Sequence, residues 1–201
     1  MMQLNLAKID VAVDALGPGR RVIVWVQGCP RRCRGCITPQ MLEFVPAQLW
    51  SIPKLLGFLE QYEPYEGVTF VGGEPVSQAA ALVQLIDELR SRRDAGVVTY
   101  TGYTLGELLA ARNPAWHALV DRSDLLVDGE YVESLAGNYL WRGSANQELH
   151  FRSDRYRSWE QEASVTATRV SLRLDGDQLQ LIGIPGEKLL EALARHGFQI
   201  R

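Results

Sequence analysis

The chain has 201 residues and a formal net charge of −3, with 46% hydrophobic and 22% charged residues. This composition is that of a globular protein with one main hydrophobic core and room for a small appendage, and it excludes a disordered or fibrous chain. The small negative charge argues against nucleic acid as a partner, and neither a membrane-spanning apolar run nor a secretory signal is present, so we expect a cytoplasmic protein without membrane contact.

Strands and helices are predicted to alternate over the first 130 residues. Residues 22–26 (Val-Ile-Val-Trp-Val) form a β-branched and aromatic run that is typical of a strand buried on both faces. Similar runs occupy residues 67–71, 97–100 and 125–128. Helix starts are indicated at Ser51, near Ser77, at the capping box Thr104-Leu-Gly-Glu107 and at Asn113-Pro114. The alternation predicts an α/β fold with a mainly parallel sheet, whose ligand site lies at the carboxyl ends of the strands.

The alternation stops at about residue 151. Residues 151–168 are largely polar and charged, which we interpret as a linker or exposed loop. Residues 169–174 and 178–182 alternate at period two around the turn Asp175-Gly176-Asp177, which predicts a β-hairpin, and a short helix follows Gly186 and ends at Gly197. We therefore expect a core domain over residues 1–150, and a linker with a C-terminal hairpin and helix appendage over residues 151–201.

The three cysteines lie on one short segment, in the pattern Cys29-x-x-x-Cys33-x-x-Cys36. An odd number of closely spaced cysteines favours a metal site in a reducing compartment over a disulfide framework. Three thiolates on one loop suit three corners of a [4Fe–4S] cluster and leave the fourth iron free to bind a substrate. The alternatives are a zinc site completed by His117 or His150, or unrelated surface cysteines, although the paired Cys-x-x-Cys motifs usual in zinc sites are absent.

The second predicted strand ends in Gly72-Gly73-Glu74-Pro75. Two glycines let a ligand approach the backbone, and a carboxylate accepts hydrogen bonds from an ammonium group. Alone this stretch is a turn, but after a three-cysteine loop it resembles the radical S-adenosylmethionine superfamily. The resemblance implies that the methionine group of S-adenosylmethionine binds the open iron, that Gly72 to Pro75 hold its amino group, and that cluster reduction releases a 5′-deoxyadenosyl radical.

Four further stretches resemble the family of anaerobic ribonucleotide reductase activating proteins. They are residues 17–29, 100–104 (Tyr-Thr-Gly-Tyr-Thr), 126–129 (Leu-Val-Asp-Gly) and 141–147 (Trp-Arg-Gly-Ser-Ala-Asn-Gln), and their order and spacing match as well. The resemblance implies a shortened, open (β/α) radical S-adenosylmethionine partial barrel over residues 1–150. It also implies hydrogen abstraction from a glycine of a partner protein, a glycyl-radical enzyme, with a flavodoxin- or ferredoxin-type reductant.

Two more segments are candidates for the site. Thr101, Gly102 and Tyr103 are expected to line the nucleoside half of S-adenosylmethionine, and the alternative is a simple helix-entry turn capped by Thr104. Asp128, at the end of an otherwise apolar strand, is expected either to belong to the site or to cap the following loop.

The sequence departs from that family at three places. Ile37 follows the third cysteine where relatives often have an aromatic residue or histidine, Glu130 stands where a basic residue is expected, and residues from about 151 onward have no counterpart in the short activating proteins. These differences bear on the partner more than on the chemistry. The arginines near the cluster loop either form a solvated face or contact an acidic electron donor; they are Arg31, Arg32 and Arg34.

Three functions are compatible with these motifs. The leading one is generation of a radical from S-adenosylmethionine and its transfer to a protein. The second is the same chemistry on a peptide or small molecule, which a short and laterally open barrel disfavours because it excludes water poorly. The third is an iron–sulfur electron-transfer or binding module, which three cysteines without a fourth disfavour, because electron carriers generally ligate all four irons.

Overall fold

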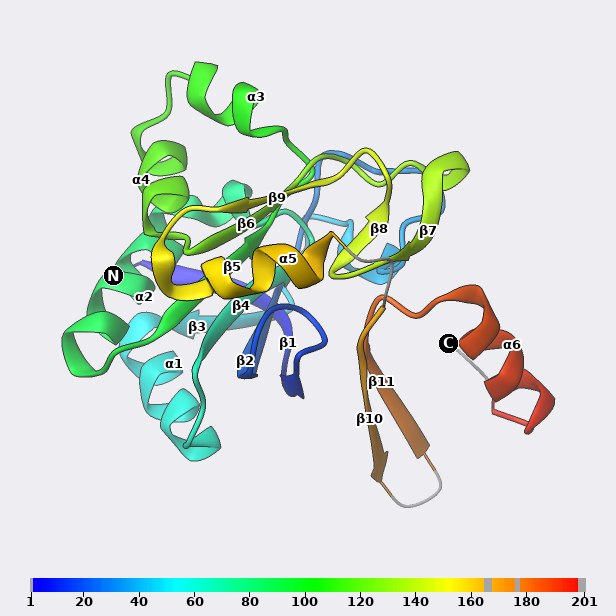
Figure 1. Cartoon of the computed structure of the whole chain (residues 1–201). Coiled ribbons are helices and arrows are strands. Elements are labelled where there is room, and N and C mark those ends of the chain that lie inside the picture. Colours follow the sequence, from blue (N-terminus) through cyan, green and yellow to red (C-terminus); the bar gives the residue numbers. More distant parts are fainter. Residues whose placement is uncertain (1, 165–167, 176–177, 199–201) are drawn as a thin grey trace.

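The computed structural model describes residues 2–164, 168–175 and 178–198. Its centre is a seven-stranded sheet with the strand order β3-β1-β2-β4-β5-β6-β9 (Figure 1). The four central strands are parallel neighbours, and all four were predicted from the sequence: β2 (Arg20–Val26), β4 (Gly67–Gly72), β5 (Gly96–Tyr100) and β6 (Leu125–Asp128). The α/β class is therefore confirmed.

The flanking strands of the sheet run antiparallel and were not predicted. β1 (Gln3–Val13) pairs with both β2 and β3 (Gln48–Ser51), and β9 (Glu148–Phe151) pairs with β6. Much of β1 is only half-buried and carries Lys8 and Asp10, so its sequence lacks the continuous apolar signal of β2. A small separate sheet joins β7 (Ala136–Tyr139) to β8 (Arg142–Ser144).

The helices begin close to the predicted positions. They are α1 (Ile52–Leu59), α2 (Ala79–Arg92), α3 (Leu105–Ala110) and α4 (Pro114–Arg122). Thr104 forms the expected capping box with Glu107, whereas the side chain of Ser51 makes no capping hydrogen bond. Short 3-10 turns complete the core: η1 (Pro39–Met41), η2 (Glu60–Tyr62), η3 (Pro75–Gln78) and η4 (Glu133–Leu135). No helix in the described ranges has the length and apolar character needed to cross a membrane.

Successive residues of β2 contribute to two hydrophobic cores. Val22, Val24 and Val26 belong to the core that also contains the buried residues of α1, α2 and α4. Ile23 and Trp25 belong to a second core on the opposite face of the sheet, together with Trp141, Tyr156 and Ile182. This alternation is the expected consequence of the period of two along a strand, and it explains why residues 22–26 of β2 are all apolar.

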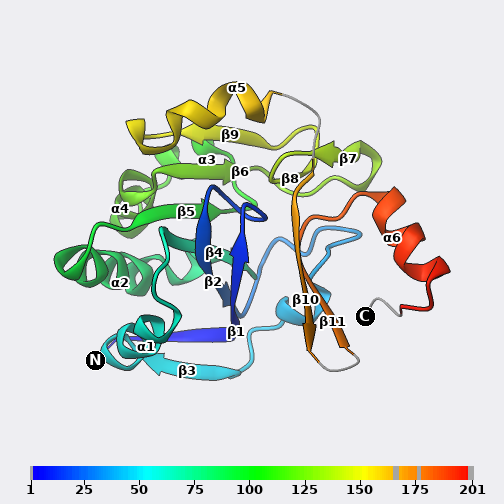
Figure 2. The ribbon, with the colours of Figure 1, turned by 60° about the horizontal axis from the view of Figure 1, so that its bottom comes forward.

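The interpretation of residues 151–168 as a linker is wrong over the part that is described. β9 extends to Phe151, so the expected boundary at residue 150 falls inside a strand of the main sheet. It is followed by η5 (Asp154–Trp159) and α5 (Glu160–Ala163), which lie beside β9 in Figures 1 and 2. Residues 165–167 lie outside the described ranges.

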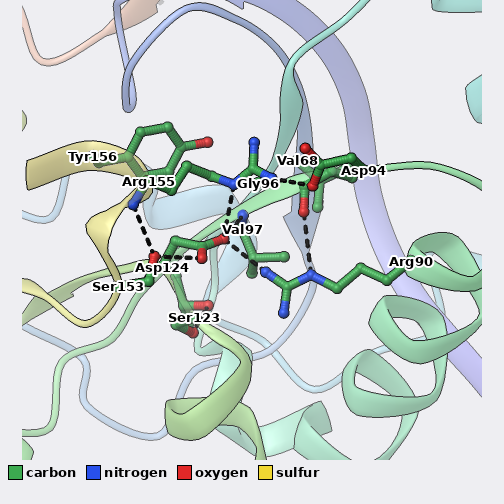
Figure 3. Close-up of polar contacts among 12 residues, drawn as sticks. Val68, Arg90, Asp94, Gly96, Val97, Ser123, Asp124, Ser153, Arg155 and Tyr156 are labelled. Carbon is green, nitrogen blue, oxygen red and sulfur yellow. Dashed lines mark hydrogen bonds and ion pairs between the residues drawn. The ribbon is translucent and has the colours of Figure 1, made fainter.

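Buried polar contacts explain why this segment is ordered. Asp124 accepts hydrogen bonds from the N–H of Val97 at 2.8 Å, from Arg90 at 2.7 Å and from the hydroxyl of Ser153 at 2.7 Å (Figure 3). Tyr156 is 1% exposed, and its hydroxyl accepts a 2.6 Å hydrogen bond from the guanidinium of Arg21. Polar residues that the sequence suggests to be solvated are therefore partners of buried groups in the core.

The predicted hairpin and final helix are confirmed as β10 (Val170–Asp175), β11 (Gln178–Gly183) and α6 (Glu187–Arg195). They stand out from the main sheet in Figures 1 and 2. The turn residues Gly176 and Asp177 lie outside the described ranges. Ile182 is 3% exposed in the second core, while Leu174, on the opposite face of the hairpin, is 70% exposed, so the hairpin contacts the core through the face that carries Ile182.

Candidate functional site

The three cysteines lie on the loop that follows β2. The N–H of Gly28 donates to the carbonyl of Met41 at 2.9 Å, and the N–H of Cys29 donates to the carbonyl of Leu42 at 2.9 Å, so the loop folds back on η1. Cys29 is buried, and Cys33 and Cys36 are half-buried. The loop that carries all three thiols therefore follows the carboxyl end of a central parallel strand, where a ligand site was expected.

The donor chemistry of this loop fits an iron–sulfur cluster with one open iron. The chain has three cysteines and no fourth. Burial raises the pKa of the Cys29 and Cys33 thiols, which disfavours free thiolates in the absence of a cation. A bound metal reverses that preference, because a coordinating thiol is deprotonated by the charge of the metal.

The segment from Gly72 to Pro75 is joined to the cysteine loop through its backbone. The N–H of Gly73 donates to the carbonyl of Val26 at 2.8 Å, and the N–H of Glu74 donates to the carbonyl of Gly28 at 2.8 Å. A Cβ on Gly73 would lie 2.4 Å from the carbonyl oxygen of Gly28. Glycine is therefore required at position 73 by the close approach of the cysteine loop itself.

The Glu74 carboxyl group connects the ends of β4 and β5. It is 1% exposed and accepts hydrogen bonds from the N–H of Val76 at 3.1 Å and from the N–H of Gly102 at 2.8 Å. Burial raises the pKa of Glu74 to about 7, and the hydrogen bonds from Gly102, Val76 and Thr101 oppose that rise. Pro75, also buried, is the first residue of η3.

The turn that contains Thr101, Gly102 and Tyr103 lies next to Glu74. The N–H of Thr101 donates to the carbonyl of Val127 at 2.9 Å, and the hydroxyl of Thr101 accepts from the N–H of Tyr103 at 3.2 Å. The guanidinium carbon of Arg31 lies 4.8 Å from the centre of the Tyr103 ring. This turn is also the entry to α3, which Thr104 caps, so the helix-entry alternative is confirmed, and contact with the nucleoside stays a prediction.

Asp128 lies at the end of β6 and makes mainly structural contacts. It is 4% exposed and accepts hydrogen bonds from the N–H of Leu105 at 2.5 Å and from the N–H of Glu148 at 3.3 Å. His150 lies beside it, with its Nε2 atom 2.9 Å from an Asp128 oxygen. These contacts join β6, β9 and the first turn of α3, and they support the capping alternative more directly than contact with a nucleoside.

Each arginine near the cysteine loop is paired with a glutamate of the same chain. Arg31 lies 3.2 Å from Glu130, Arg32 lies 2.8 Å from Glu43, and Arg34 lies 3.1 Å from Glu133. Glu130, the departure from the expected basic residue, is thus the partner of Arg31. The loop does not present the uncompensated positive face that contact with an acidic electron donor would favour.

A hollow of about 420 Å³ opens beside Cys33. It is bounded by residues 31–34 and by residues 130–134. The second of these segments is held by side chains of the 141–147 stretch: Ser144 accepts from the N–H of Val132 at 3.2 Å, and Gln147 donates to the carbonyl of Gly129 at 2.9 Å. The sequence left Ser144 open between a site contact and the bracing of a turn, and gave Gln147 no individual role, because a single sequence does not show which loop a side chain braces.

Two further supports of the site carried no sequence signal. The hydroxyl of Thr38 donates to the carbonyl of Gly72 at 3.1 Å, and the amide of Gln78 donates to the carbonyl of Gln27 at 3.1 Å. The zinc alternative finds no support: within the described ranges, the only group of three metal-ligating atoms within 4.8 Å of one another is Asp128, Glu148 and His150, without a cysteine.

The three-cysteine loop lies at the end of a central parallel strand and is hydrogen-bonded to a Gly-Gly-Glu-Pro turn. This combination defines an iron–sulfur enzyme of the radical S-adenosylmethionine class. The chain belongs to the 4Fe-4S single cluster domain family, whose model matches residues 15–150. Its cofactors are accordingly a [4Fe–4S] cluster and S-adenosylmethionine, as the sequence predicted.

Similar proteins agree with this assignment. The anaerobic ribonucleoside-triphosphate reductase-activating protein of Vibrio cholerae serotype O1 is 31% identical over 150 residues, which cover 67% of this chain and 89% of that protein. The protein of the same name from Salmonella typhimurium is 34% identical over 144 residues, covering 67% of this chain and 90% of its own. Among solved structures, QueE from Escherichia coli gives a TM-score of 0.44 at 20% identity, covering 51% of this chain and 53% of that one. The family model and the two activating proteins confirm the resemblance to radical S-adenosylmethionine activating proteins.

Proposed function

We propose that this protein activates an anaerobic ribonucleotide reductase by generating a radical on a glycine of that partner. The observation that supports the proposal is the pair of backbone hydrogen bonds that joins the cysteine loop to Gly73 and Glu74, so that the three cysteines and the Gly-Gly-Glu-Pro turn share one edge of the sheet. The relatives with this activity in their names are covered over 89% and 90% of their length, so nearly all of their sequence has a counterpart here.

We assign Cys29, Cys33 and Cys36 to the cluster. The amino group of S-adenosylmethionine is assigned to Gly72, Gly73, Glu74 and Pro75, and its nucleoside half to Thr101, Gly102 and Tyr103. Asp128 is assigned to the positioning of that nucleoside turn, because it holds the first N–H of α3. When bound and reduced, the cluster supplies the electron that cleaves S-adenosylmethionine to methionine and a 5′-deoxyadenosyl radical.

The residues around the loop determine how the ligand is held. Glu74 has a role distinct from direct contact with iron: its carboxyl group fixes the turn at Gly102 relative to the end of β4. Arg31 packs over the ring of Tyr103 and forms an ion pair with Glu130, so it borders the proposed site on the side of Tyr103. The proposed position of the ligand is between the ends of β4 and β5, whose relative placement is held by the buried carboxyl group of Glu74.

The proposed architecture is a shortened, open (β/α) barrel. The carboxyl ends of the four parallel strands form the edge of the site. Both sides of the sheet end in antiparallel strands, where a full barrel would have further βα units. A site on a short barrel remains open at its side, and a docked protein can cover it and exclude water. This supports a protein substrate over a small molecule.

The hairpin and α6 are proposed to contribute to partner recognition. They follow the segment matched by the family model, which ends at residue 150, and they expose Leu172 at 47% and Leu174 at 70%. The two leucines are alternate residues of β10 and therefore lie on the same face of the hairpin, where they offer apolar area to a partner. A flavodoxin- or ferredoxin-type protein is the proposed reductant because the family resemblance implies it, and its docking would not use the paired arginines beside the cysteine loop. A cytoplasmic location is proposed because three closely spaced cysteines suit a reducing compartment.

The test uses protein reconstituted anaerobically with iron and sulfide. With S-adenosylmethionine, a reductant and the anaerobic ribonucleotide reductase from the same organism, we expect 5′-deoxyadenosine and a glycyl-radical signal in electron paramagnetic resonance. A Cys33→Ala variant is the control and should give neither. Production of 5′-deoxyadenosine without a glycyl radical would support the cleavage of S-adenosylmethionine but would contradict the proposed partner.

A further inference from the structure

The paired strands β6 and β9 bring three metal-ligating side chains to one face of the sheet. Asp128 is directly opposite Glu148, and His150 follows Glu148 by two positions, so all three project to the same side. His150 Nε2 lies 2.9 Å from Asp128 Oδ2 and 3.9 Å from Glu148 Oε2. The three ligand atoms lie within 4.8 Å of one another.

The contact between His150 and Asp128 is close without being a hydrogen bond. The Nε2 atom of His150 is buried and has no hydrogen-bond partner, although an Asp128 oxygen is 2.9 Å away. Two atoms that bind one ion at adjacent positions, each about 2.1 Å from it, are themselves about 3 Å apart. The separation alone also fits a hydrogen bond, but His150 Nε2 makes none, so the two atoms have the spacing of neighbouring ligands of a cation.

We propose that Asp128, Glu148 and His150 form a binding site for a divalent transition-metal ion, separate from the three-cysteine loop. One imidazole and two carboxylates suit Mn²⁺, Fe²⁺ or Zn²⁺ better than Mg²⁺ or Ca²⁺, which prefer oxygen ligands alone. Asp128 is fixed, with its side chain 5% exposed, while the Glu148 side chain is 73% exposed and makes no other contact within ion-pair distance in the described ranges. An ion would thus enter from solvent, and Glu148 would close over it.

The position of the site gives the ion a structural effect. The Asp128 oxygen that faces His150 also accepts the N–H of Leu105, the first residue of α3, which follows the turn from Thr101 to Tyr103. An ion would hold β6, β9 and this turn in one arrangement. This coupling, unlike the site itself, rests on the proposed function, since it assigns the nucleoside half of S-adenosylmethionine to that turn.

The binding test uses Mn²⁺ and the reconstituted protein with its cluster oxidised, in which state the cluster gives no paramagnetic signal. We expect one Mn²⁺ per chain and a ¹⁴N coupling from one imidazole in pulsed electron paramagnetic resonance. His150→Ala should abolish the nitrogen coupling, and Glu148→Gln should weaken binding about tenfold or more. His196→Ala, which changes a histidine at the end of α6, is the matched control and should leave binding unchanged.

Competition identifies the class of ion. Zn²⁺ should displace Mn²⁺, whereas Mg²⁺ at the same concentration should not. Equal Mn²⁺ binding by the wild type and the His150→Ala and Glu148→Gln variants would overturn the site, as would the absence of stoichiometric binding. Glu148 is exposed, so its variant tests the proposal even if His150→Ala does not fold. If Mn²⁺ binds as expected but S-adenosylmethionine affinity is the same with and without it, the site stands and its coupling to the nucleoside turn is overturned.

Discussion

The N–H of Glu74 donates a 2.8 Å hydrogen bond to the carbonyl oxygen of Gly28, the residue before the first cysteine. This bond joins the two motifs that the sequence identifies separately. The turn after β4 therefore supports the cysteine loop, and a substitution in one motif should alter the structure of the other.

Replacement of Gly73 is the sharpest test of this connection. A Cβ at this position would lie 2.4 Å from the Gly28 carbonyl oxygen and 2.9 Å from its carbon, and backbone atoms move less readily than a side chain. We expect Gly73→Ala to lower the iron content after reconstitution as well as S-adenosylmethionine binding. Gly57→Ala is the matched control: Gly57 lies in α1 with nothing within 4 Å, and the helix should gain up to about 1 kcal/mol.

Normal iron content in Gly73→Ala, with only ligand binding impaired, would show that the two motifs act independently. Iron content and visible absorption measure the first effect, and equilibrium dialysis with S-adenosylmethionine measures the second.

Loss of any one cysteine should prevent stable cluster assembly. The chain has no fourth cysteine to substitute for a missing ligand, so Cys29→Ala, Cys33→Ala and Cys36→Ala should each lose the cluster and the cleavage of S-adenosylmethionine. Iron and sulfide analysis with electron paramagnetic resonance of the reduced protein would check this. Full activity in one variant would show that its thiol is not a ligand.

The buried carboxyl group of Glu74 should make stability depend on pH. Its folded pKa of about 7 lies above the ordinary value of 4.5, so the folded state holds the proton more tightly. The contribution is fully present below about pH 4.5 and is lost as the pH rises to about 7, and a shift of this size corresponds to roughly 3 kcal/mol.

Isotope-edited infrared spectroscopy can follow this proton directly. We expect the band of a protonated carboxylic acid to persist at about pH 6 in the wild type and to disappear as the pH rises through about 7, and to be missing from Glu74→Gln at about pH 6, where ordinary carboxyl groups are ionised. The same variant should show a flatter dependence of unfolding free energy on pH. A wild-type protein whose Glu74 is ionised throughout this range would contradict the prediction.

Periodicity and capping signals predicted the four parallel strands and the starts of α1 to α4, because those elements are buried or capped through local chemistry. β1 and β9 carried no such signal. β9 (Glu-Leu-His-Phe) presents polar side chains on the face that meets Asp128, so its sequence resembles that of an exposed segment. Tertiary contacts, and not intrinsic propensity, make it a strand.

The site was predictable where chemistry is concentrated in one segment, and not where it depends on distant partners. The cysteine pattern and Gly72 to Pro75 lie on adjoining strand ends, as expected from the rule for parallel sheets. The burial of Glu74 and its bond to Gly102, in contrast, join residues 28 positions apart. A single sequence contains no information on such pairs.

The contact between Tyr156 and Arg21 should contribute measurably to stability. Arg21 is 1% exposed, and the acceptors around it are uncharged: a tyrosine hydroxyl, the Thr69 hydroxyl and three backbone carbonyls. Tyr156→Phe leaves one buried cationic N–H without its partner, which should cost about 1–3 kcal/mol of unfolding free energy. Tyr139→Phe is the control, since Tyr139 is half-buried and its ring contact with Arg142 would persist. Equal stability of the two variants would contradict this account.

Two truncations separate the core from the appendage. Ending the chain at residue 150 removes Tyr156, Ala163 and Ile182 from the second core and leaves the buried Arg21 without its tyrosine partner, so we expect this protein to be insoluble or unfolded. Ending it at residue 164 keeps η5 and α5 and removes the hairpin and α6. In the described part of the hairpin and α6, Ile182 is the only buried apolar residue. Its loss should lower the free energy of unfolding by roughly 1.5–3 kcal/mol.

The protein of residues 1–164 should then bind iron and produce 5′-deoxyadenosine with a chemical reductant, because all candidate site residues precede residue 151 and their supports are retained. It should fail to form a glycyl radical on the partner if the hairpin and α6 take part in recognition. Circular dichroism and iron content must first match those of the full chain. A folded 1–164 protein that activates the partner normally would remove the appendage from recognition. One that keeps its cluster but loses cleavage would place the appendage in the active site.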